Sequence, residues 1–129
     1  MIAKQKAREV ISSWFALLNT NDVNAIDRAL GDFFTEDYVL HFSAPADLQP
    51  GLAGLKSFFP KVLAENPNVK VTVEDLLVDV NRIAFRLTIQ RTDPATGKPQ
   101  HCAELCISRF VGEKIAEEWE LLGSWEDDA

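Results

Sequence analysis

The stretch NVKVTVEDLLVDVNRIAFRLTIQRT, residues 68–92, marks the point at which the hydrophobic period of the chain changes. Within it, apolar residues alternate with polar ones on both sides of the pair Asn81-Arg82. The alternating apolar residues are Val69, Val71, Val73, Ile83, Phe85, Leu87 and Ile89. A period of two is typical of a half-buried strand, because successive side chains of a strand point to opposite faces. The stretch therefore predicts two strands joined by a turn.

Before this stretch the apolar residues recur every three or four positions, as on the buried face of a helix. This spacing predicts an amphipathic helix over residues 3–20 and a short second helix over 22–31, with an N-cap at Asn21 or Asp22 and an end at Gly31. A strand over 37–42 and a proline-containing loop follow. A third helix is predicted over 52–63, and Pro60 is expected to kink or split it.

After this stretch, a turn segment at 93–99 and two further strands, 101–110 and 114–122, complete the pattern. Helices come first and an antiparallel meander of strands follows. This order is typical of an α+β fold. Residues 1–129 are expected to form one domain.

Charge and cysteine content exclude several classes of function. The net charge is −7 and Lys and Arg form no run, which argues against nucleic acid or an anionic membrane as a partner. The N-terminus lacks the apolar region of a signal peptide, and no apolar run reaches the roughly 20 residues of a membrane span, so a cytoplasmic location is expected. Cys102 and Cys106 would lie roughly 13 Å apart on one strand. We expect free thiols, and we expect no metal site at His101 because further ligands are missing.

The last strand, which contains IAEEWELL at 115–122, carries three closely spaced glutamates. If Gly112-Glu113 forms a two-residue turn, Phe110 pairs with Ile115 and Ser108 with Glu117. Continued alternation then places Glu117 and Trp119 on the interior face. The same face is expected to carry Phe85, Leu87, Glu104, Cys106 and Ser108. Glu118 and Glu120 are then expected to point outward.

A glutamate on an apolar face is costly unless it is paired, hydrogen-bonded, protonated or reached by water. Glu117 either bonds to a backbone group or to Ser108, or serves as a pocket carboxylate with a raised pKa that moves protons. Glu104 on the same face favours the second interpretation. A change of register by one residue would exchange the two faces.

Several motifs, taken in order, resemble the SnoaL-like polyketide cyclase family. They are the tail SRFVGEKIAEEWELLGSW at 108–125, the pair YVLHFSAP and GLAGLKSFF, and NPNVKVTVEDLLVDVNRIAFRLTIQRT at 66–92. The resemblance implies the NTF2-like fold, in which helices pack on a curved antiparallel sheet and form a cone with an internal pocket. It also implies a homodimer and supports His41 and Glu117 as pocket residues. His41 could equally be a structural histidine. Trp14 and Trp119 are expected to form core and pocket wall, and the alternative is that they are stacking platforms.

One departure from the family bears on activity. The acidic residue that the cyclases commonly carry four residues after the tryptophan is replaced by Gly123. If chemistry persists, Glu117 or Glu104 together with His41 must carry it. Two functions are open. One is a cofactor-independent isomerase or cyclase that moves a proton on a small apolar carbonyl compound. The other is a non-catalytic homodimer that binds a small ligand.

The outward face of the sheet is expected to be the dimer interface. An apolar patch is predicted there, with charged residues at its rim. The patch consists of Ala103, Leu105, Ile107 and Leu122, and its rim of Arg86, Arg109, Glu118 and Glu120.

Overall fold

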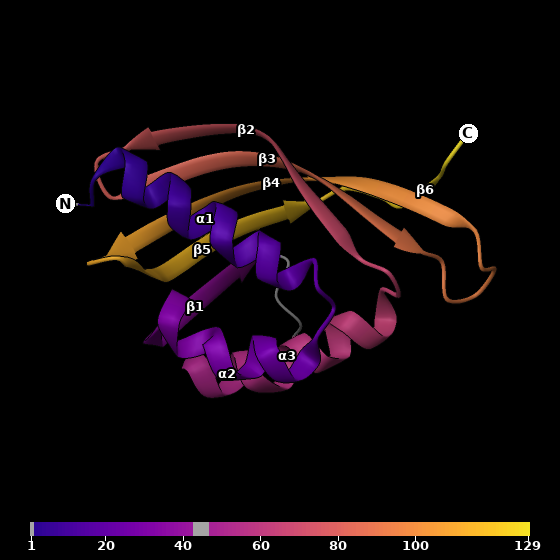
Figure 1. Cartoon of the computed structure of the whole chain (residues 1–129), viewed down its shortest axis with the longest axis horizontal. Coiled ribbons are helices and arrows are strands. Elements are labelled where there is room, and N and C mark those ends of the chain that lie inside the picture. The colour runs from indigo at the N-terminus through magenta and orange to yellow at the C-terminus, as the bar shows by residue number, and fades with distance from the viewer. Residues whose placement is uncertain (1, 43–46) are drawn as a thin grey trace.

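The computed structural model describes residues 2–42 and 47–129, which form three helices and six strands (Figure 1). The elements, in chain order, are α1 (Lys4–Leu18), α2 (Val23–Phe33), β1 (Phe34–Phe42), α3 (Gly51–Glu65), β2 (Lys70–Asp79), β3 (Arg82–Thr92), β4 (Pro99–Val111), β5 (Lys114–Leu122) and β6 (Glu126–Asp127). This order confirms the α+β class and adds β6 to the predicted strands.

The helices follow the predicted spacing with small changes at their ends. The Asp22 side chain caps α2 by accepting a 3.0 Å hydrogen bond from the backbone N–H of Ala25. Gly31 does not end this helix, which continues to Phe33. Pro60 does not split α3: Leu55 and Leu63 are buried on either side of it, and the helix runs without a break. Packing on both sides of the proline holds the two halves in one element.

The sheet is open and mixed, with strand order β1-β5-β4-β3-β2 and with β6 paired to β4. Strands β2 to β5 form the predicted antiparallel meander. The expectation of a wholly antiparallel sheet is wrong at β1, which pairs parallel to β5. This strand precedes α3 in sequence and joins the far edge of the sheet.

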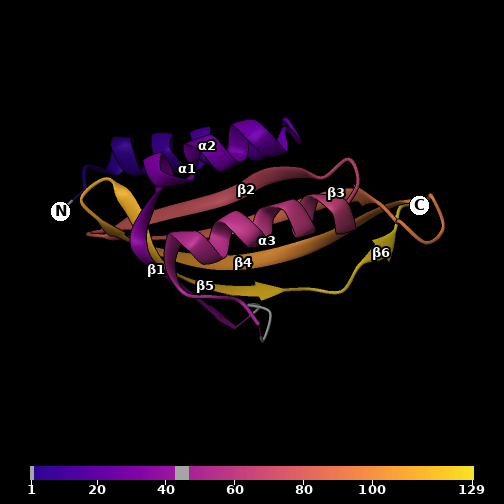
Figure 2. The ribbon, with the colours of Figure 1, turned by 90° about the horizontal axis from the view of Figure 1, so that it is seen from below.

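The three helices lie on one side of the curved sheet, which therefore has an inner, covered face and an outer face (Figure 2). The inner face provides most of the core, including Ile83, Phe85, Leu87 and Phe110. Trp14 of α1 packs edge-on against Phe34 at 4.9 Å between ring centroids. In the described part of the chain, no helix is both long and apolar enough to cross a membrane.

A β-bulge at Ala116 decides which side chains of β5 point inward. Phe110 pairs with Ile115, as predicted, but Arg109 then pairs with Glu117, so that Ala116 is an extra residue opposite this step. Ile115 and Ala116 are consequently both buried, although they are neighbours in the strand. Beyond the bulge every side chain lies on the face opposite to the one that regular alternation would give.

Candidate functional site

The bulge reverses the predicted placement of the glutamates in β5. Ser108 pairs with Glu118, and Cys106 pairs with Glu120. Glu118 is only 7% exposed. The prediction that Glu117 and Trp119 face the interior is wrong, and so is the prediction that Glu118 and Glu120 point outward. The predicted turn at Gly112-Glu113 is present, so the error lies in the strand and not in the turn.

Glu117 belongs to a polar cluster on the outer face. Its carboxylate lies 2.6 Å from Nε2 of His41 and accepts a 2.9 Å hydrogen bond from Nε of Arg109. These two partners lower the pKa of Glu117, His41 first. The His41 ring stacks on Trp119 at 5.2 Å, and Arg82 lies over the same indole ring. The partially exposed Glu117 is an ion-pair partner and not a raised-pKa pocket acid.

A cavity of about 340 Å³ lies between the inner face of the sheet and the helices. Much of its wall is aromatic and aliphatic, and includes Trp14, Phe15, Phe34, Phe58, Phe59 and Leu87. Four glutamates line it: Glu104, Glu118 and Glu120 on the sheet, and the exposed Glu65 at the end of α3. The cavity therefore combines an apolar enclosure with a few convergent polar groups, as small-molecule sites commonly do.

Glu118 accepts hydrogen bonds from three side chains. Tyr38 donates to its Oε1 at 2.8 Å, and Ser108 donates to its Oε2. The thiol of Cys106 donates to the same Oε2 at 3.5 Å. Burial raises the pKa of Glu118, while these three donors act in the opposite direction. Donors of this kind favour the ionised form, so they oppose the effect of burial on Glu118 without reversing it.

Glu104 and Glu120 lie in a setting that favours their protonated forms. Burial, together with the charge of Glu118, raises the pKa of Glu104 from 4.5 to about 7. Burial, followed by the charges of Glu104 and Glu118, raises the pKa of Glu120 well above its ordinary value. Carboxyl groups this close repel one another when ionised, and the group retains protons at neutral pH as a result.

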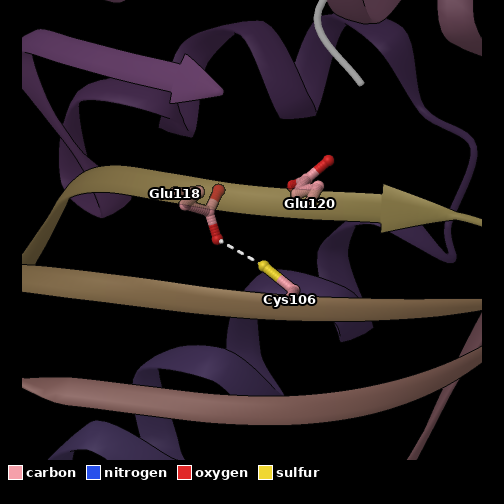
Figure 3. A group of neighbouring side chains, drawn as sticks. All are labelled: Cys106, Glu118 and Glu120. Carbon is pink, nitrogen blue, oxygen red and sulfur yellow. Dashed lines mark hydrogen bonds between the residues drawn. The ribbon is translucent and has the colours of Figure 1, made fainter. Parts of the chain in front are cut away.

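Cys106, Glu118 and Glu120 are also the residues that come closest to forming a metal site. Their ligand atoms all lie within 4.8 Å of one another, and Figure 3 shows the Cys106 thiol directed at Glu118 across β4 and β5. Burial and then the charge of Glu118 raise the pKa of the Cys106 thiol, so this sulfur remains protonated. A thiolate is the form that binds metal. In this protonated state the thiol donates a hydrogen bond to Glu118.

The structure brings together only some of the residues predicted from the sequence. Glu104, Leu87 and Trp14 line the inner cavity as predicted. Cys106 and Ser108 also lie on the inner face, where both contact Glu118. The remaining four candidates lie elsewhere. Phe85 packs in the core at 5.9 Å from Phe15, and Glu117, His41 and Trp119 lie on the outer face.

Sequence reasoning missed Tyr38, Glu118 and Glu120 as site residues. The signal that could have found them is the pair Ile115-Ala116, two apolar neighbours directly after the turn. A second signal is the polar series at every other position of β4, which contains Glu104, Cys106 and Ser108 and requires polar partners on the facing strand.

Structural comparison finds similar folds at low sequence identity. TsrD from Streptomyces laurentii superimposes with a TM-score of 0.80 at 16% identity, over 95% of this chain and 91% of that protein. A SnoaL-like polyketide cyclase from Agrobacterium tumefaciens gives a TM-score of 0.74 at 22% identity, over 91% of both chains. An uncharacterised protein of cystatin fold from Novosphingobium aromaticivorans gives 0.70 at 17% identity, over 89% of this chain and 97% of that one. These likenesses establish the fold.

No protein of curated function matches the chain at a significant level. The model of one sequence family does match, over residues 8–124, which is most of the chain. That family is described as SnoaL-like polyketide cyclase, and its expected helix-and-sheet fold agrees with the architecture above. The chain therefore belongs to the SnoaL-like polyketide cyclase family.

Proposed function

We propose that this protein is a cofactor-independent enzyme that transfers a proton on an apolar carbonyl compound bound in the inner cavity. The observation that carries this proposal is the group of three carboxyls, Glu104, Glu118 and Glu120, in an otherwise mostly apolar cavity. General acid–base catalysis is most efficient when the catalytic pKa lies near the working pH. The pKa of Glu104, about 7, meets this condition.

The three carboxyls divide into complementary roles. The charge of Glu118, whose carboxylate accepts hydrogen bonds from Tyr38, Ser108 and Cys106, raises the pKa of both neighbours and so helps to keep a proton on them. Of Glu104 and Glu120, the ionised one takes a proton from the carbon next to the substrate carbonyl. The protonated one donates to the carbonyl oxygen as negative charge develops there. The product of this step is an enol, which regains a proton at carbon or attacks a second carbonyl.

Exchange of hydrogen for deuterium next to a ketone tests this step without knowledge of the natural substrate. With 1-tetralone in heavy water, the protein should accelerate the loss of the α-proton signal by about a hundredfold over buffer, the lower end of general acid–base effects. Glu104→Gln and Glu120→Gln should each remove most of this acceleration. Glu117→Gln changes the same side chain on the outer face and should leave it intact.

Two results would contradict the proposal. One is a wild-type rate equal to that of buffer, and the other is a loss of exchange in Glu117→Gln that equals the loss in Glu104→Gln. Circular dichroism of each variant separates loss of activity from loss of fold.

The non-catalytic alternative has one observation in its favour. Gly123, at the position where the resemblance implies an acidic residue, donates its N–H to the carbonyl of Ala103 at 2.8 Å. A Cβ atom added there would lie 3.1 Å from the same oxygen, which leaves little room for a side chain. If the cavity only binds, 1-tetralone should shift the thermal midpoint of the protein without any exchange above buffer.

We also propose that the protein is a homodimer through its outer sheet face. A hollow of about 450 Å³ there is lined by apolar side chains, among them Leu77, Leu105, Ile107, Trp119 and Leu121. Leu105 is 57% exposed and Leu77 is 68% exposed. The predicted patch thus needs two changes: Leu121 replaces Leu122, which lines the inner cavity, and Glu118 and Glu120 leave the rim.

A further inference from the structure

Among the described residues, a single cationic side chain lines the inner cavity, at a distance from Glu104, Glu118 and Glu120. Arg91 of β3 is the one Arg, Lys or His among the lining residues. It pairs across the sheet with Gln100, whose Oε1 accepts from Nε at 3.1 Å and from one terminal nitrogen at 3.0 Å. The other terminal nitrogen donates to Asn66 at the end of α3 at 2.8 Å, and Trp125 packs against the guanidinium at 4.0 Å.

These partners fix the position of the guanidinium but do not neutralise it. Both acceptors are neutral amide oxygens, and no ion pair among the described residues includes Arg91. These three hydrogen bonds use three of the five N–H groups of an arginine. Within the described part of the chain, one N–H on each terminal nitrogen is left for a ligand. Glu65, an acid that lines this cavity, is exposed to solvent and therefore screened.

The distance between this cation and the acids follows from the strand that joins them. Gln100, the partner of Arg91, and Glu104 both lie on β4 and are separated by four residues. Four residues of strand span roughly 13 Å. Because the side chains of Arg91 and Glu104 both reach into the cavity, the gap that a ligand must bridge is on the order of 10 Å.

We propose that Arg91 is a specificity-determining residue that binds a carboxylate at one end of the substrate. This inference rests on the proposed function and names its substrate class: an apolar keto acid whose carbonyl lies about 10 Å from its carboxylate. Arginine matches the planar carboxylate with two parallel hydrogen bonds. The same charge would be repelled at the other end of the cavity, where the group of Glu104, Glu118 and Glu120 carries negative charge. The two ends therefore impose one orientation, with the carboxylate at Arg91 and the carbonyl at the acids.

Paired probes of equal shape test the charge requirement. 5-Phenylvalerate and 5-phenylpentanol have the same carbon skeleton but end in a carboxylate and in a hydroxyl. In calorimetric titrations, the wild-type protein should bind the carboxylate about tenfold tighter than the alcohol, as expected for a charge-assisted hydrogen bond. The carboxylate should also shift the NMR signal of the Trp125 indole N–H, because this ring packs on Arg91.

Three variants separate the role of Arg91 from a general effect of charge. Arg91→Gln should reduce the ratio of the affinities for the carboxylate and the alcohol to about one. The affinity for the alcohol should stay unchanged. Arg82→Gln removes the same charge from an arginine that also lies over a tryptophan, Trp119, but on the outer face, and should keep the full preference. Arg91→Lys keeps the charge without the planar fork and should keep part of the preference, a test that stands even if Arg91→Gln does not fold.

The proposal is overturned if wild-type protein binds neither probe or binds both equally. It is also overturned if Arg91→Gln keeps the preference for the carboxylate, or if Arg82→Gln loses it. These failures are distinguishable from failure of the proposed function. Exchange into 1-tetralone, which has no carboxylate, tests the roles of Glu104 and Glu120. If exchange persists without any carboxylate preference, only the substrate class is wrong. If the preference is found without exchange, only the chemistry is wrong.

Discussion

At the scale of single residues, membership of the candidate site depends on which face of the sheet each glutamate of β5 occupies. Glu117 and Glu118 are adjacent in sequence and have the same side chain, yet their surroundings shift their pKa values in opposite directions. Contacts with His41 and Arg109 lower the pKa of Glu117. Burial on the inner face raises the pKa of Glu118. The environment, and not the residue type, makes one an ion-pair partner and the other part of an acid cluster.

The raised pKa of Glu104 makes the stability of the protein depend on pH. The folded state holds its proton up to about pH 7, whereas an exposed glutamate releases it near 4.5. Between these values the folded state binds more protons, so the free energy of unfolding falls as the pH rises. The difference between these two pKa values corresponds to roughly 3 kcal/mol in the free energy of unfolding. Urea unfolding at pH 5 and pH 8 should therefore show a smaller loss of stability in Glu104→Gln than in the wild type.

The control for this measurement is Glu36→Gln, a change to an exposed glutamate of β1. It should reproduce the pH dependence of the wild type. Equal pH dependence in Glu104→Gln and the wild type would show that Glu104 is not held in its protonated form.

At the scale of elements, periodicity predicted most of the fold and failed at one position. Helix and strand periods located α1, α2, α3 and strands β2 to β5, because burial of one face enforces a fixed spacing. The parallel pairing of β1 with β5 was not predictable in the same way. It joins residues far apart in sequence, such as His41 and Trp119, and depends on how the helices place β1.

The bulge at Ala116 explains why the site was harder to predict than the fold. One extra residue leaves the strand and its turn in place but moves every later side chain to the other face. The inward-facing side chains of β4, from Phe110 to Glu104, come before the bulge in sequence, and their face was predicted correctly. Glu118 and Glu120 follow the bulge and were placed on the wrong side. A bulge depends on local packing, and hydrophobic alternation alone does not reveal it.

At the scale of the whole molecule, the two faces of the sheet have separate roles. Helices cover the inner face and enclose the cavity with its acids and Arg91. No described helix covers the outer face, where exposed leucines lie next to charged groups of both signs, including Arg86 and Asp75. Such a surface can pair with its own copy, because a two-fold axis brings each charge near residues of the partner's equivalent patch.

Light scattering tests the proposed dimer. The wild-type protein should show twice the mass of one chain at micromolar concentration. Leu105→Glu places a charge in the centre of the patch and should give a monomer that remains folded. Val23→Glu adds the same charge to an exposed position of α2, on the other side of the molecule, and should remain dimeric. A monomeric wild-type protein up to high micromolar concentration would contradict the interface.

We expect Glu104 and Glu120, and not Glu117, to hold protons at neutral pH. Carbon-13 NMR titration of the glutamate carboxyls, each assigned through its Gln variant, measures this most directly. Glu104 should have a midpoint near 7, and Glu117 a midpoint below the ordinary value of 4.5. A raised midpoint at Glu117, together with an ordinary one at Glu104, would contradict it and return the site to the opposite face of the sheet.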